Sequence, residues 1–166
     1  MLRKMLQKII NRLPASWLRI LFNQWRPFWG AGITVDWISP DFSTIKASLT
    51  LHWYNQNYVG VHFGGSLFVL TDAFYMLILM RQLGADYIVW DKAAYIEFKK
   101  PGRGRVHAVF SFTSEEIAAI RATADSQEKY VFERLVDVID EQGDVVASAV
   151  KTLYVRRKSP IVSKAL

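Results

Sequence analysis

The sequence predicts a single α+β domain in which one sheet wraps around one long helix. Its 166 residues are close to the usual length of one domain, and 51% of them are hydrophobic, which argues against disorder for most of the chain. One long apolar segment with good helix formers ends at a glycine. Segments of strand composition, separated by turn residues, surround it.

The expected elements follow from these patterns in order along the chain. The central helix covers residues 66–82 and ends at Gly84, and the run is too short and too interrupted for a membrane span. A short helix is expected over residues 115–125 with Ser114 as its N-cap, and residues 141–144 form a hairpin turn. The expected strands are residues 31–38, 44–53, 93–99, 105–113, 129–140 and 145–157.

The composition excludes several kinds of site. The chain has no cysteine, which rules out disulfides, thiolate metal sites and a cysteine nucleophile. The three histidines, His52, His62 and His107, do not fall at a metal-ligand spacing such as HxxxH. We therefore expect no metal site.

The net charge of +6 belongs to the first 26 residues, which hold six basic residues and no acidic one. The rest of the chain is formally neutral, so we expect no nucleic-acid partner. Residues 1–13 have the pattern of a basic amphipathic helix, and Pro14 fits the first turn of a second helix over 15–25. This extension, residues 1–26, packs on its own domain or on a partner subunit, or contacts a membrane surface. Residues 27–158 form the domain and 159–166 a tail.

The chain lacks the uninterrupted apolar segment and small-residue cleavage site of a secretory signal, so we expect a cytoplasmic protein.

Asp72 is the residue most indicative of function, because it lies in the apolar helix. Burying an ionised carboxylate is costly, so this side chain must be paired or line a cleft. Gly64 and Gly65 lie at the helix N-terminus, where backbone N–H groups and the helix dipole can polarise a carbonyl. The seven-residue spacing from Gly65 places Asp72 on the same helix face, so that a base and a donor could share one pocket. The alternatives are an aspartate that satisfies polar groups at a subunit contact, and a glycine pair that forms a plain tight loop.

The segment from Asn57 to Asp72, NYVGVHFGGSLFVLTD, resembles the motif of hotdog-fold acyl-CoA thioesterases of the phenylacetate-degradation type. Their motif runs Asn, Gly, His-Gly-Gly and then an acid seven residues later. The segment is also similar to a less characterised branch of the superfamily with His-Phe-Gly-Gly. The resemblance implies a curved antiparallel sheet around a central helix. It also implies a homo-oligomer, a dimer or tetramer, with active sites at the dimer interface, and hydrolysis of acyl-coenzyme A without a metal or redox cofactor.

The resemblance assigns roles by position. Asp72 matches the catalytic acid, which acts as general base or nucleophile, and Gly64 matches the glycine whose N–H, with that of Gly65, polarises the carbonyl. Asn57 matches the asparagine that orients substrate or water. Phe63 occupies the histidine position of the family, and His62 lies one residue earlier.

Asp91 falls near a family position that carries serine or threonine for the neighbouring subunit's site; the alternative is a solvated loop acid beside Lys92. Two basic groups are candidates to hold the phosphates of coenzyme A. They are Lys99, Lys100, Arg103 and Arg105 in one group, and Arg156, Arg157 and Lys158 in the other.

The sequence thus predicts an acyl-CoA thioesterase. One alternative is a non-catalytic acyl-CoA or lipid-binding hotdog protein, since Phe63 replaces the histidine. Another is a membrane-surface interaction protein that acts through its N-terminal helix.

Overall fold

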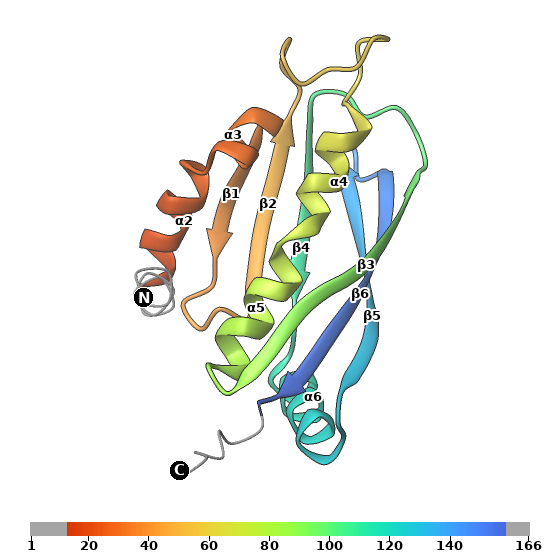
Figure 1. Ribbon diagram of the computed structural model, residues 1–166. Helices are drawn as coiled ribbons and strands as arrows, with labels where there is room; N and C mark the ends of the chain where they lie inside the picture. Colours follow the sequence, from red (N-terminus) through yellow and green to blue (C-terminus); the bar gives the residue numbers. More distant parts are fainter. Residues whose placement is uncertain (1–12, 159–166) are drawn as a thin grey trace, which may run out of the picture.

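An apolar helical segment packs against one face of a curved six-stranded antiparallel sheet in the computed structural model, which describes residues 13–158 (Figure 1). The strand order is β1-β2-β4-β5-β6-β3, so β1 and β3 form the two edges. The strands are β1 (Ile33–Ile38), β2 (Thr44–Thr50), β3 (Tyr87–Phe98), β4 (Arg105–Ser111), β5 (Tyr130–Asp140) and β6 (Val145–Arg157). The predicted sheet around a helix is confirmed.

The central helical segment consists of α4 (Gly64–Asp72) and α5 (Phe74–Leu83), with a break at Ala73 instead of one continuous helix over 66–82. Next to the break, the Thr71 hydroxyl donates a hydrogen bond to the Phe68 carbonyl at 2.9 Å, a local bond that competes with the helical ladder. We predicted that this segment is too short for a membrane span, and this prediction is wrong, because the length and composition of the segment are sufficient for one. It spans 20 residues, and its most apolar 18-residue window has a mean hydropathy of 1.4. Half of its most apolar window is buried, as in a core helix.

Phe74 lies at the centre of the core. Its ring packs against Phe110 of β4 and Phe28, with centroids 4.8 and 5.4 Å away. Leu70, Ile78 and other side chains of the helical segment are fully buried against the sheet. Burial of each such side chain contributes roughly 1.5–3 kcal/mol, so this helix anchors the fold.

The N-terminal extension packs on its own domain, over the part that the structure describes. It forms α2 (Ala15–Asn23) and α3 (Arg26–Ala31), two short helices beside β1 where we expected one (Figure 1). Leu18 and Phe28 join the core. The basic helix expected over residues 1–13 lies almost entirely outside the described residues.

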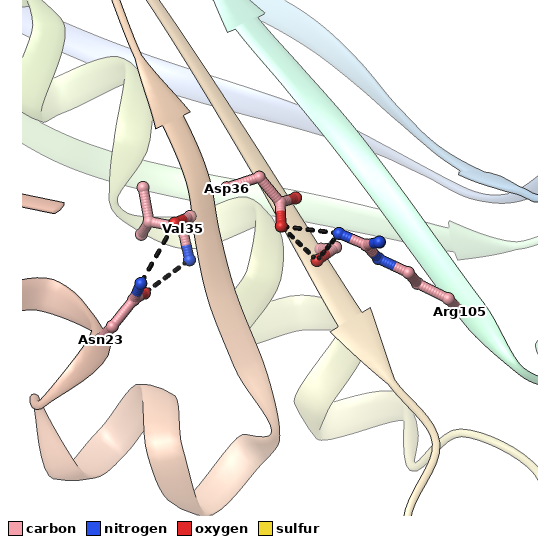
Figure 2. A network of polar contacts seen from close by, with 5 residues as sticks. Asn23, Val35, Asp36 and Arg105 are labelled. Atoms are coloured by element: carbon pink, nitrogen blue, oxygen red, sulfur yellow. Dashed lines mark hydrogen bonds and ion pairs between the residues drawn. The ribbon is translucent and has the colours of Figure 1, made fainter. Parts of the chain in front are cut away.

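Asn23 protects the β1 edge of the sheet. Its side-chain amide donates to the Val35 carbonyl at 3.2 Å, and its oxygen accepts the Val35 N–H at 2.7 Å (Figure 2). An unpaired edge strand invites another chain to add to the sheet. Here the Asn23 side chain occupies the backbone N–H and carbonyl of Val35, so these two groups are not available to another chain.

Several boundaries differ from the sequence-based prediction; among them, β2 ends at Thr50 and not at residue 53, and β4 ends at Ser111 and not at residue 113. The chain from 26 to 31 is helical, so β1 starts at Ile33, and β3 begins at Tyr87, well before 93. The helix α6 (Ser114–Ser126) is capped by Thr113 and not by Ser114. The Thr113 hydroxyl accepts the Glu116 N–H, and the Glu116 carboxylate accepts the Thr113 N–H, a capping box that fixes the helix start. The turn between β5 and β6 is confirmed at residues 141–144.

Candidate active site

A buried lysine holds the predicted catalytic aspartate. Lys151 lies in the middle of β6, only 1% exposed, and its Nζ donates to Asp72 Oδ1 at 2.8 Å. The same ammonium lies 3.6 Å from Asp91 Oδ2 and 5.9 Å from the centre of the Phe68 ring. A buried cation is tolerated only when it is paired, and here two carboxylates and a ring face compensate it.

Asp91 is the more buried of the two carboxylates. It lies in β3, next to a β-bulge, and not in a loop. Its side chain is 18% exposed, and its Oδ1 is buried without a hydrogen-bond partner among the described residues. Burial raises the pKa of Asp91, and the Lys151 charge opposes this rise.

Asp72 differs from Asp91 because its side chain is 54% exposed. It is the last residue of α4, and Lys151 holds one of its oxygens from below the surface. A carboxylate with one fixed oxygen and an exposed surface can accept a proton from a bound molecule. The pairing expected for Asp72 is therefore present, with a partner that the sequence interpretation did not identify.

The N-terminus of α4 offers two backbone donors. Phe63 is the N-cap and makes no side-chain capping bond, and the N–H groups of Gly64 and Gly65 have no acceptor among the residues that the structure describes. A Cβ on Gly64 would lie 3.0 Å from the Phe98 ring, and one on Gly65 would lie 2.3 Å from the Phe63 ring. Glycine therefore allows both rings to lie against this helix end.

Within one subunit, Gly64 and Asp72 are too far apart to act on the same carbonyl. Eight residues of α-helix rise by about 12 Å. The expectation that both groups share a pocket can therefore hold only between two subunits.

A shallow cleft of about 400 Å³ adjoins the start of α4. It brings together five of the predicted site residues, together with Phe98 and residues 101–102. These five are Asn57, His62, Gly64, Lys99 and Lys100. Asp72, Asp91 and Arg103 do not line this cleft. The predicted residues thus form two groups in one subunit.

Asn57 and His62 shape the cleft through their contacts with the chain. The Asn57 side-chain oxygen accepts the N–H groups of Val59 and Val61, both at 3.1 Å, which fixes the loop before α4. His62 is buried, and its Nε2 lies 3.2 Å from the Gly104 carbonyl. Burial lowers the pKa of His62, which favours the neutral form of its ring.

Most of the predicted phosphate-binding residues are paired with carboxylates. Lys100 contacts Asp140 and Asp144, both at 2.6 Å, and Arg105 contacts Asp36 at 2.6 Å (Figure 2). Lys99 pairs with Glu97, and Arg157 of the second group lies 3.4 Å from Asp125. Arg103 is exposed and has no ion-pair partner within the described part of the chain.

Within residues 13–158, no group of three His, Asp or Glu side chains is placed to hold a metal ion.

Lys151 is the site residue that sequence reasoning missed. Strand alternation contains a signal for it, because every second residue of β6 faces the core. The residues on that face are Ala147, Ala149, Lys151, Leu153 and Val155, all essentially inaccessible to solvent. A lysine in such a row predicts a buried cation that requires an acidic partner.

The strand order and the central helix define a hotdog fold, and solved structures confirm this class. A Pseudomonas aeruginosa protein of unknown function, PA5026, described as a probable thioesterase, matches with a TM-score of 0.76 and 21% identity over 88% of this chain and 97% of that chain. The thioesterase HI1161 from Haemophilus influenzae matches with a TM-score of 0.62 and 15% identity, over 93% and 96% of the two chains. The PaaI protein of the Escherichia coli phenylacetic acid degradation operon has a TM-score of 0.57 and 17% identity, over 87% and 94%.

The family model described as "Domain of unknown function (DUF4442)" matches residues 15–155, and the chain belongs to this family. The match begins at the first residue of α2, so the helices beside β1 are part of the family domain. A comparison with curated proteins found no match.

Proposed function

We propose that this protein hydrolyses an acyl thioester, with acyl-coenzyme A as the substrate class. The observation that carries the proposal is the exposed carboxylate of Asp72 held by the buried ammonium of Lys151 at 2.8 Å. A charge in a fixed position at the surface of an apolar helix is suited to proton transfer. The hotdog thioesterase among the solved structures supports the same reaction class.

The reaction needs one base and one carbonyl-polarising donor. Asp72 removes a proton from water as the water oxygen bonds to the thioester carbonyl carbon. The carbon–sulfur bond then breaks, and the departing thiolate takes the proton from Asp72. The products are a carboxylic acid, which ionises in solution, and a free thiol, and the aspartate returns to its ionised state.

Gly64 supplies the donor in this proposal, supported by the unpartnered N–H groups at the start of α4. Because the helical rise separates Gly64 from Asp72 by about 12 Å, the donor of one subunit must serve the carboxylate of another. A two-fold axis repeats every contact, so a dimer would contain two such sites.

The exposed edge strand β3 supports assembly into a dimer. It is 12 residues long, pairs only with β6 among the described strands, and exposes Trp90, Tyr95 and Phe98. Long uncovered edges are normally protected or paired with another chain. We infer that a second copy covers β3 and that the protein is a dimer or an even-numbered oligomer of dimers.

A panel of phenylacyl and fatty acyl coenzyme A thioesters, assayed for thiol release by the full-length protein, tests the reaction. Release from at least one substrate is expected. Binding of coenzyme A without release from any substrate would support the alternative of a binding protein, in which Phe63 over Gly65 marks the loss of catalysis.

Gly64→Pro tests the donor directly. Proline is tolerated at the first position of a helix and removes the N–H, but its ring carbons also approach the Phe98 ring, 3.0 Å from a Cβ at this position. Gly64→Ala, which adds the same Cβ and keeps the N–H, is the matched control. Phe63 before it already has an extended backbone, with φ −64° and ψ 126°, as a residue before proline requires. We expect turnover to fall by on the order of 100- to 1,000-fold, the usual effect of removing one such donor. Unchanged turnover would exclude this N–H from the reaction.

Mixing two inactive variants tests the shared site. A dimer of one Asp72→Asn subunit and one Gly64→Pro subunit retains one site with both an intact donor and an intact carboxylate. Activity is expected to reappear after the variants are unfolded and refolded together, and not after separate refolding. Failure to recover activity, with mixed dimers present, would argue for a site within one subunit.

A further inference from the structure

The outer surface of α2 and α3 carries an unusual row of exposed apolar side chains. These residues, which we call the tryptophan face, are Trp17, Ile20, Leu21, Trp25 and Trp29. Within α2, Trp17, Ile20 and Leu21 lie at helical spacing on one side, and Trp25, the N-cap of α3, lies four residues before Trp29. The opposite side holds the buried Leu18 and Phe28, which join the core. The helices are therefore apolar on two sides, and among residues 13–158 only one of these sides packs within the subunit.

The charge around the tryptophan face has a single sign. Arg19 and Arg26, which belong to the same two helices, are exposed, and residues 14–32 contain no aspartate or glutamate. No carboxylate of the described chain forms an ion pair with either arginine. A partner for this surface must therefore be apolar and anionic.

A second copy of the chain does not fit this requirement. In a two-fold contact the same surface meets itself, so Arg19 and Arg26 would face arginines with no acid between them. Sheet extension is also blocked here, because Asn23 occupies the backbone groups of Val35 (Figure 2). The edge left for sheet pairing is β3, at the opposite end of the sheet from α2 and α3 (Figure 1).

We propose that the tryptophan face docks on the surface of an anionic lipid bilayer. Tryptophan prefers the boundary between lipid headgroups and acyl chains, and arginine binds the phosphate groups at the same depth. Exposed apolar side chains at helical spacing, with basic residues among them, are typical of helices that lie in this boundary. The inference rests on α2 and α3 alone and does not depend on the proposed hydrolysis.

Vesicle binding by the full-length protein tests the proposal. The probes are vesicles of phosphatidylcholine alone and vesicles of equal parts phosphatidylcholine and phosphatidylserine, with binding measured by co-sedimentation and by quenching of tryptophan fluorescence with a lipid-attached quencher. Three variants are compared, Trp17→Gln/Trp25→Gln, Arg19→Gln/Arg26→Gln and the control Trp90→Gln. In one subunit Trp90 has the same exposure as Trp17, 63%, but it lies on the opposite edge strand β3. Because we place β3 at the dimer contact, sedimentation must show that this control keeps the wild-type oligomeric state.

The wild type and Trp90→Gln are expected to bind the anionic vesicles, and the tryptophan double variant to lose binding. The arginine double variant is expected to bind more weakly by about fivefold per arginine. Circular dichroism checks that each variant is folded. Equal binding by the tryptophan double variant and the Trp90→Gln control overturns the proposal, as does absence of wild-type binding to anionic vesicles. A smaller oligomer in the tryptophan double variant, without vesicle binding by the wild type, would instead identify the face as a subunit contact.

Discussion

Replacing Lys151 by methionine removes the positive charge between Asp72 and Asp91 and keeps a side chain of similar length. The attraction between Lys151 and Asp72 at 2.8 Å amounts to about 6 kcal/mol at an effective dielectric constant of about 20. Water screens the half-exposed Asp72, and the burial of the ammonium itself costs several kcal/mol. Loss of Lys151 also leaves the mostly buried Asp91 without a compensating charge, so we expect the free energy of unfolding at neutral pH to fall by about 3 kcal/mol in Lys151→Met.

The turnover number kcat is also expected to fall in Lys151→Met. Without the ammonium, Asp72 loses the contact that fixes one of its oxygens, and misplacement of a catalytic group lowers turnover on the order of 10- to 100-fold. Thiol release under saturating substrate measures kcat, and the KM is expected to stay near that of the wild type. The matched control is Lys46→Met, the same change at an exposed position of β2.

The pH dependence of the free energy of unfolding shows whether Lys151 acts through its charge or only through the volume that its side chain fills. Burial already raises the pKa of Asp91, and loss of the Lys151 charge raises it further. A carboxyl group with a raised pKa in the fold favours folding below its unfolded pKa, and this contribution is lost as the pH rises through the folded pKa. The variant should therefore lose stability relative to the wild type as the pH rises through that range. A variant with wild-type kcat and a parallel stability profile would refute a role for Lys151 in the site.

Three further predictions concern the fold around the site. Burial lowers the pKa of His62 below its ordinary value of 6.5. The free energy of unfolding should therefore keep its full contribution from the neutral ring above pH 6.5 and decrease as the pH falls below this value. In His62→Gln, which keeps a donor to the Gly104 carbonyl, the free energy of unfolding measured by denaturant titration should depend less on pH. Asn55→Ala removes a buried side chain that makes three hydrogen bonds to the backbone, and should lower the free energy of unfolding by about 3 kcal/mol in urea denaturation; a loss close to zero would contradict this. Thr113→Ala removes the cap of α6 and should cost about 1 kcal/mol, measured as a lower thermal midpoint, whereas Ser114→Ala should have little effect.

Local patterns in the sequence were sufficient to predict one sheet around one helix, and the resemblance of the segment from Asn57 to Asp72 implied that this arrangement is a hotdog fold. Strands β4, β5 and β6 show alternation or turn residues at their ends, and the apolar segment ending at Gly84 corresponds to the helical core. The break at Ala73 was not predicted, because the apolar run continues through it without a glycine or proline. The first residues of β3 were also missed, although residues 87–90, YIVW, have the aromatic and β-branched composition of a strand.

Sequence patterns predicted one member of the ion pair at the candidate site and missed the other. Asp72 was identified because a carboxylate in an apolar helix violates the local pattern. Its partner Lys151 is 79 residues away, and the two meet only because β6 lies beside the helix in the folded sheet. The pairing of Lys100 with Asp140 and Asp144 likewise depends on the hairpin of β5 and β6. Such contacts follow from strand order, which no local pattern specifies.

The most direct test of the central claim compares turnover and binding in Asp72→Asn. Asparagine has nearly the same shape and keeps one oxygen acceptor for Lys151, but it cannot accept a proton at neutral pH. Thiol release is expected to fall on the order of 100- to 10,000-fold, while a non-hydrolysable acyl-coenzyme A analogue binds about as tightly as it does to the wild type. Turnover near that of the wild type in Asp72→Asn would contradict the assignment of this carboxylate as the base.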